Sequence, residues 1–183
     1  MACLCCHSYL EITMIYDIFP TRFGDTMICA ENDALRGLYF LGQKYQALVL
    51  PDWSQAPQDS LLQEVKAQFK AYEKSGIAGF DVPLDPQGTE FQKKVWKALL
   101  TISVGTTSTY GRIAKMAASM AAVRAVGSAI GKNPISIIIP CHRVLGSDGS
   151  LTGYAGGLSR KAVLLKHEGA SFVGMSETTD LFA

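Results

Sequence analysis

The first half of the chain alternates between short apolar runs and turn residues, a pattern that predicts β-structure followed by one helix. Between residues 15 and 50, three runs have the composition of strands, at 27–29, 37–41 and 47–50. From 60 to 72 the spacing becomes helical. The residues that fall on one side of this helix are Leu61, Leu62, Val65 and Phe69. The pattern favours a small α+β domain.

A second, helical pattern begins after a linker punctuated by Pro83, Pro86 and Gly88. Thr89 with Gln92 three residues later is typical of a capping box at a helix N-terminus. The apolar stripe of this helix comprises Phe91, Val95, Leu99 and Leu100. A mostly helical second domain is therefore expected.

Two further short helices are predicted, one starting at 110–114 and one over 121–131. The tight connection at 118–120 favours a helix-turn-helix. Arg124 is the only charged residue of the second helix, and most of the others are Ala, Gly or Ser. Such a smooth helix has little with which to read base edges in the major groove, so we expect sequence-independent binding through the minor groove. The alternative is that its alanines pack against another helix.

A thiol and an imidazole follow the apolar run 137–139, which predicts a short buried strand or core segment. Pro140 lacks an N–H donor and ends regular pairing, so Cys141 is expected at a bend. We expect His142 and Arg143 to lower the pKa of the Cys141 thiol, as a nucleophile requires. The alternative is one more buried core cysteine.

The length and composition suit one large domain or two small ones, since 48% of the 183 residues are hydrophobic. No apolar stretch approaches the roughly 20 residues that span a bilayer, and no secretory signal is evident. Five cysteines are an odd number, and four lie within the first 29 residues. These features predict a reducing, cytoplasmic setting without a disulfide framework.

The net charge of +1 averages two unlike halves. Residues 1–88 contain six Lys and Arg against eleven Asp and Glu, whereas residues 89–168 contain eleven against three, so the net charges are −5 and +8. This asymmetry indicates a polyanionic partner for the second half, most simply nucleic acid. The alternative is a basic face that is only solvated.

Seven short motifs between residues 88 and 169 resemble those of a known family. They are 88–92 (GTEFQ), 109–111 (TYG), 124–127 (RAVG), 133–134 (NP), 140–144 (PCHRV), 153–158 (GYAGGL) and 167–169 (HEG). In this order and spacing, residues 86–169 closely resemble the catalytic domain of O6-alkylguanine-DNA alkyltransferases. The resemblance implies an α+β protein in which a ribonuclease-H-like α/β domain (14–85) precedes a mostly helical, winged-helix-like catalytic domain (86–169) with a helix-turn-helix. Residues 1–13 and 170–183 are an extension and a tail.

The resemblance implies a single-turnover suicide reaction in which an alkyl group moves irreversibly from O6 of guanine to Cys141. His142, oriented by Glu168, would take the thiol proton through a water. Asn133 would hold the turn that carries the thiol, and Tyr110 would donate to N3 of the departing guanine. The implied partner is double-stranded DNA containing O6-alkylguanine, bound by a monomer in the bacterial cytosol or nucleoid, or in a eukaryotic nucleus, without cofactor, metal or membrane.

The resemblance also implies roles for further residues that match the family's motifs by position. The nucleotide would be flipped out of the duplex, with Arg124 filling the gap. The other residues of the DNA-binding helix are Ala125, Gly127 and Ser128. The implied substrate pocket comprises Ser136, Val144, Tyr154, Ala155, Gly156 and Lys161.

Three departures from the family pattern stand out. Ala155 replaces the serine of some members and Ser136 the proline of others, which removes a hydroxyl contact and opens the pocket. The inter-helix turn has Ala118 and Met120 where glycine and proline are usual.

Three alternatives remain open. Cys3, Cys5, Cys6 and His7 have the ligand types of a zinc site, although their spacing is unusual and Met14 is a second candidate start. A cysteine hydrolase would pair Cys141 with His7 or His167. Alkyltransferase-like proteins bind the same lesions but lack the reactive cysteine.

Overall fold

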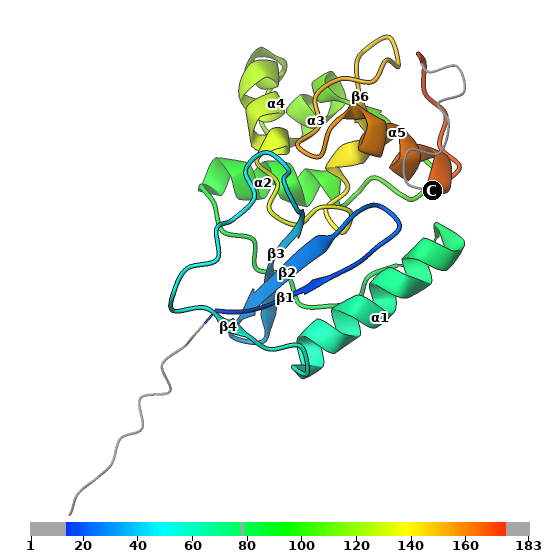
Figure 1. Ribbon diagram of the computed structural model, residues 1–183. Coiled ribbons are helices and arrows are strands. Elements are labelled where there is room, and N and C mark those ends of the chain that lie inside the picture. The colour runs from blue at the N-terminus through cyan, green and yellow to red at the C-terminus, as the bar shows by residue number, and fades with distance from the viewer. Residues whose placement is uncertain (1–13, 78, 175–183) are drawn as a thin grey trace, which may run out of the picture.

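A computed structural model describes residues 14–77 and 79–174, and a four-stranded sheet dominates its first part (Figure 1). Its strands are β1 (Ile15–Phe19), β2 (Thr26–Glu31), β3 (Ala34–Phe40) and β4 (Ser54–Gln55), in the order β3-β2-β1-β4. β2 pairs antiparallel with β1 and β3, and β4 pairs parallel with β1. The runs predicted at 27–29 and 37–41 fall within or overlap β2 and β3, whereas β1 was not predicted.

The strand predicted at 47–50 is wrong. Residues 46–50 have no regular structure, and Leu48 is 80% exposed. An apolar run forms a strand only where it can pair and bury one face, and here no strand of the sheet pairs with it.

Helix α1 (Ser60–Ser75) lies beside the sheet (Figure 1). The Asp59 side chain accepts a hydrogen bond from the backbone N–H of Leu62, which caps the first turn. Its buried residues are Leu62, Val65, Phe69 and Tyr72. The predicted apolar face is thus confirmed, and it extends one turn further, to Tyr72. Gly76 ends the helix with a φ of 71°, a conformation that favours glycine.

The second part is mostly helical, as predicted. It contains α2 (Glu90–Leu99), α3 (Tyr110–Ala117), the short 3₁₀ helix η1 (Met120–Ala122), α4 (Val123–Gly131), the 3₁₀ turn η2 (Cys141–Arg143) and α5 (Leu158–His167). Two short strands, β5 (Ser108–Thr109) and β6 (Val144–Leu145), pair in parallel. The Thr89–Gln92 capping box is present. Leu100 is 49% exposed and does not extend the apolar stripe, and α4 starts two residues later than predicted.

The strand considered at 137–139 is wrong, because this segment is a buried turn. Ile137 has a φ of 68°, and the N–H of Ile139 donates to the carbonyl of Ile135 at 3.0 Å. The side chain of Asn133 also bonds both the N–H and the carbonyl of Ile135. These local bonds replace strand pairing, and the alternative of a buried core segment is the one the structure adopts.

One continuous hydrophobic cluster joins the two parts, including Phe23, Leu38 and Phe69 from the first and Trp96, Val126 and Leu164 from the second. The edge strand β3 reaches the second part through the backbone as well. The N–H of Leu38 donates to the Pro134 carbonyl, and the N–H of Ser136 donates to the Leu38 carbonyl. The sheet therefore supports the turn that precedes Cys141. Over the described ranges, no helix is long and apolar enough to cross a membrane.

Candidate active site

Cys141 begins the 3₁₀ turn η2, so the predicted bend is confirmed. The residue is only 5% exposed. Its Sγ lies 3.1 Å from Nδ2 of Asn133, which also donates to the Ile139 carbonyl at 2.7 Å. Asn133 thus ties the thiol to the turn that leads into it.

The side chains of His142 and Arg143 point to a carboxylate. Nε2 of His142 lies 2.9 Å from Oε1 of Glu168. Arg143 makes a two-pronged contact with the same carboxylate, from Nε to Oε2 at 2.7 Å and from Nη2 to Oε1 at 2.9 Å. All three residues are buried. A turn and the end of α5, far apart in sequence, therefore share one ionic network.

This network fixes the protonation states of its members. Burial raises the pKa of Glu168, but hydrogen bonds from His142 and Arg143 outweigh it and hold the pKa at about 2. Burial lowers the pKa of His142 and outweighs the opposing effect of Glu168. At neutral pH an ionised carboxylate therefore faces a neutral imidazole.

The expectation that His142 and Arg143 lower the pKa of Cys141 through their side chains is wrong. Burial raises the pKa of this thiol, and the groups that oppose burial are Asn133, the nearby charge of Lys161 and backbone N–H groups, that of His142 included. The imidazole of His142 and the guanidinium of Arg143 are hydrogen-bonded to Glu168 instead. In this structure Cys141 is a thiol at neutral pH.

Lys161, on α5, is a fully buried lysine held by backbone carbonyls. Its Nζ donates to the carbonyls of Val144 and Thr152. Burial lowers its pKa to about 8, while an ionised Cys141 would raise it. The ammonium thus provides a positive charge near the sulfur.

A cavity of about 250 Å³ opens between α3, α4 and the loop before α5, and Cys141 is not among its lining residues. Its lining residues are Lys44, Tyr45, Tyr110, Gly127, Ser128, Gly131, Gly153, Tyr154 and Ala155. The structure thus brings together predicted residues from α3, α4 and the loop before α5. Burial raises the pKa of both Tyr110 and Tyr154, and the charge that Cys141 carries when it is ionised would raise both further. The β5–β6 pairing places Tyr110, just after β5, close to the segment that carries Cys141.

Four of the predicted pocket residues do not line this cavity: Ser136, Val144, Gly156 and Lys161. Val144 is fully buried, and the hydroxyl of Ser136 lies 3.3 Å from Oε1 of the buried Gln43. The Ser136 side chain thus contacts the N-terminal part and also lies close enough to act on Tyr154, which lines the cavity, so its effect on the size of the pocket stays a prediction.

Three of the four predicted DNA-binding residues lie on the outer side of α4. Arg124, Ala125 and Ser128 are exposed, whereas Val126, Ala129 and Ile130 face the core. Gly127 faces the Tyr110 ring, which a Cβ at this position would meet at 3.7 Å. The alternative, that the alanines of this helix only pack against other parts of the protein, is correct for the buried Ala129 and wrong for the exposed Ala125.

Sequence reasoning missed the residues that the N-terminal part contributes. Lys44 and Tyr45 line the cavity, and the N–H of Lys44 donates to the Ala155 carbonyl at 3.0 Å. Tyr72 donates to Oε1 of Glu168 at 2.8 Å. Tyr45 has a φ of 63°, which no pattern signalled. The only sequence sign for Tyr72 was its place on the apolar face of α1.

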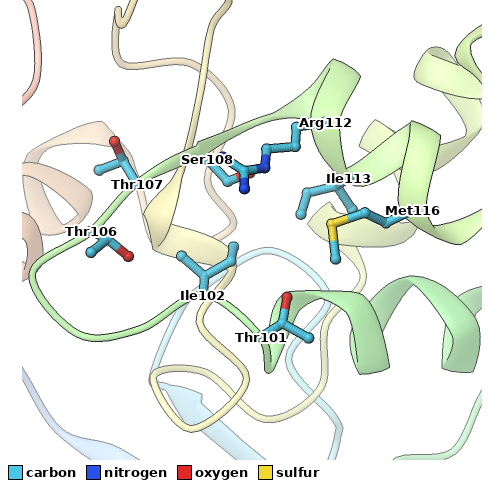
Figure 2. Close-up of a pocket in the computed structure, with 8 residues that line it drawn as sticks. All are labelled: Thr101, Ile102, Thr106, Thr107, Ser108, Arg112, Ile113 and Met116. Atoms are coloured by element: carbon cyan, nitrogen blue, oxygen red, sulfur yellow. The ribbon is translucent and has the colours of Figure 1, made fainter.

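A second cavity, of about 280 Å³, lies between the end of α2 and α3 (Figure 2). Its lining residues are Thr101, Ile102, Thr106, Thr107, Ser108, Arg112, Ile113 and Met116. None of the predicted catalytic, DNA-binding or pocket residues lines it. The proposed zinc ligands Cys3, Cys5, Cys6 and His7 lie outside the described residues.

Comparison with known proteins defines the class. Residues 90–170 match the family model described as 6-O-methylguanine DNA methyltransferase, DNA binding domain. The chain is similar to the methylated-DNA–protein-cysteine methyltransferase of Methanosarcina mazei, with 46% identity over 155 residues, 85% of this chain and 97% of that protein. A protein of the same name from Haemophilus influenzae is 39% identical, covering 87% and 89%.

The fold agrees with these relatives. The OGT protein of Mycobacterium tuberculosis, solved in complex with DNA, matches with a TM-score of 0.78 and 41% identity, over 85% of this chain and 92% of that one. The chain belongs to the methylated-DNA–protein-cysteine methyltransferase family, which confirms the resemblance identified from its motifs and the mixed α and β fold.

Proposed function

We propose that this protein repairs O6-alkylguanine in double-stranded DNA by transferring the alkyl group to Sγ of Cys141. One S–C bond forms while the O6–C bond breaks, so guanine is restored and each molecule acts once. The thiol proton passes to His142, and the departing guanine, which keeps the electron pair of the broken O6–C bond, takes up one proton to become neutral guanine. The observation that carries this proposal is the buried Cys141 next to the His142–Glu168 pair.

The geometry of that pair defines which nitrogen acts as the base. An ionised Glu168 can only accept hydrogen bonds, so Nε2 of a neutral His142 carries the proton and donates it. Nδ1 then has a lone pair, and it has no protein hydrogen-bond partner within the described part of the chain. We propose that a water bound at Nδ1 carries the Cys141 proton to it, in the arrangement of nucleophile, base and orienting group.

Tyr110 is the donor proposed for the leaving group. Burial raises the pKa of its hydroxyl, which therefore remains protonated at neutral pH. Its oxygen lies 3.2 Å from the Thr152 carbonyl and 3.1 Å from the Gly153 carbonyl, in the loop that lines the cavity, so its single proton is shared between these two acceptors. When a base occupies the cavity, we propose that the hydroxyl turns to N3 of guanine, making O6 a better leaving atom.

For DNA binding we propose that α3 and α4 act as the helix-turn-helix of a winged-helix-like domain. The exposed Arg124 would fill the space of the flipped nucleotide, while Ala125, Gly127 and Ser128 would let the duplex approach closely. We further propose that residues 14–85 have a ribonuclease-H-like topology, that the protein works as a monomer, and that it resides in the cytoplasm or nucleoid, or in a eukaryotic nucleus.

The hydrolase alternative has weaker support. His167 is engaged elsewhere, since its Nε2 lies 2.8 Å from the Tyr72 carbonyl and its ring packs against Phe23. The presence of Cys141 also separates this chain from the non-repairing relatives, which lack that residue.

The test is intact mass after incubation with excess duplex DNA carrying O6-methylguanine, with Cys141→Ala alongside. We expect a gain of one methyl group per molecule on Cys141 and none in the variant. Turnover beyond one equivalent with an unmodified thiol would indicate a hydrolase. Lesion binding without any mass gain would overturn the repair proposal.

A further inference from the structure

The carboxylate of Glu168 accepts hydrogen bonds both from the N-terminal part of the molecule and from the C-terminal part, to which Glu168 itself belongs. Oε1 accepts from the Tyr72 hydroxyl at 2.8 Å, and the same oxygen faces Nε2 of His142 and Nη2 of Arg143. Tyr72 lies on α1 and is fully buried. It is 96 residues away in sequence, so only the tertiary fold makes this contact.

The end of α1 is fixed against the end of α5, which makes the contact rigid. The Tyr72 carbonyl pairs with Nε2 of His167 at 2.8 Å, and the two rings pack at a centroid distance of 5.2 Å. At Gly76 an added Cβ would lie 2.2 Å from the His167 carbonyl oxygen, so the backbones touch. The Tyr72 hydroxyl therefore has little freedom to leave Glu168.

We infer that Tyr72 is a positioning residue for the transfer reaction: its hydroxyl withdraws charge from Oε1 of Glu168 and so keeps the His142 imidazole neutral and the Cys141 thiol protonated until substrate binds. A hydrogen bond donated to a carboxylate lowers its proton affinity, and a less basic carboxylate stabilises a neighbouring imidazolium less. The inference rests on the proposed function in assigning His142 as the base.

Besides Tyr72, four charged or titratable residues act on the relay formed by Cys141, His142 and Glu168, namely Arg143, Lys161, Tyr154 and Tyr110, the last of which interacts with an ionised Cys141. Arg143 donates to both oxygens of Glu168, Lys161 acts on His142 and Cys141 from α5, and Tyr154 lies close enough to interact with Glu168. Of these groups and Tyr72, only Tyr72 belongs to the N-terminal part. Removing the Tyr72 hydroxyl leaves the charges of Arg143 and Lys161 in place. A change in the reactivity of Cys141 can then be assigned to the loss of one hydrogen bond to Glu168.

The experiment measures the rate of carbamidomethylation of Cys141 by iodoacetamide, by peptide mapping, between pH 5 and pH 9 on the full chain without DNA. In Tyr72→Phe we expect the pH profile of the reaction to shift to lower pH by about one unit, which corresponds to a roughly tenfold faster reaction near neutral pH. The reason is that the more basic Glu168 stabilises a His142 imidazolium, so that a larger fraction of Cys141 is thiolate. Tyr39→Phe is the matched control, since Tyr39 is also buried in the N-terminal part and lies in a separate cluster. Its profile should match wild type.

Cys29 provides an internal check on opening of the fold, because it is buried in the same separate cluster. Faster reaction of Cys141 with Cys29 unchanged supports the inference. Acceleration of both cysteines in Tyr72→Phe would mean loosened packing, and a profile identical to wild type would mean no role for the hydroxyl; either result overturns it. Because no DNA is present, these outcomes are independent of the mass test for alkyl transfer.

Discussion

At the scale of single residues, the chemistry depends on how buried polar groups satisfy one another. Within the part of the chain that the structure describes, Cys141 forms no ion pair that would make it a thiolate at rest, and burial raises its pKa. His142 and Glu168 instead form a buried hydrogen-bonded pair, and Arg143 and Tyr72 both donate to the same carboxylate. A thiol that acts only once gains from this arrangement, because a resting thiolate would be consumed by unrelated electrophiles.

The buried carboxylate predicts a specific acid dependence of stability. The folded-state pKa of Glu168 is about 2, below the value of 4.5 for an unperturbed glutamate. Its stabilising contribution is therefore complete above about pH 4.5 and is lost as the pH falls toward 2. We expect the difference in unfolding free energy between wild type and Glu168→Gln to shrink across that window, as measured by urea unfolding at successive pH values. A difference that stays constant from pH 7 to pH 2.5 would contradict this.

At the scale of elements, α4 presents an almost smooth outer face with one long side chain. Arg124 is exposed at its second position, and no hydrogen bond or ion pair within the described ranges holds it. The neighbouring Ala125 and Ser128 leave room for a DNA surface, whereas Gly127 allows α4 to lie against Tyr110. The helix therefore combines close approach with one side chain able to enter the duplex.

Replacement of Arg124 should affect flipping and not the transfer chemistry. In Arg124→Ala we expect the methyl-transfer rate on duplex DNA to fall at least tenfold, since extruding a base costs a few kcal/mol that the arginine no longer offsets. The rate on a single-stranded oligonucleotide with the same lesion should change far less. Arg112→Ala, at an exposed position on α3 outside the base cavity, is the control for lost positive charge. Equal losses on both substrates would argue against a flipping role.

At the scale of the whole molecule, the two parts are joined through one core and through the site itself. The N-terminal part supplies Lys44 and Tyr45 to the cavity and Tyr72 to the relay, and β3 bonds the turn before Cys141. Its role is thus structural support and electrostatic adjustment of the catalytic part. The boundary at residues 85 and 86 stays a prediction.

A shared core predicts cooperative unfolding. In Trp53→Phe the remaining tryptophan is Trp96, which is buried in the second part and donates to the Ala129 carbonyl. Its fluorescence should report the same urea midpoint as far-UV circular dichroism, which follows both parts. Because Trp53 lies at the edge of a small separate cluster, its loss should cost little stability. Two separated midpoints would show that the parts unfold independently.

The sequence by itself determined the family and predicted helices at the positions of α1 to α4, whereas α5 was not predicted. It also named the candidate residues of the reaction, whose roles stay predictions. Helical periodicity, the Thr89 cap and motifs such as 140–144 can be recognised from neighbouring residues alone, because each depends on the local backbone. The strands were harder to predict, because the run at 47–50 has strand composition but no partner, and β1 was missed.

Only the tertiary structure decided how the thiol is controlled. Sequence proximity suggested that His142 and Arg143 act on Cys141, yet their side chains turn to Glu168, 25 residues or more away. Tyr72 gave no chemical signal, since a tyrosine on an apolar helix face is first a core residue. Protonation depends on burial and on contacts between distant segments, which are properties of the folded molecule and of no local stretch of sequence.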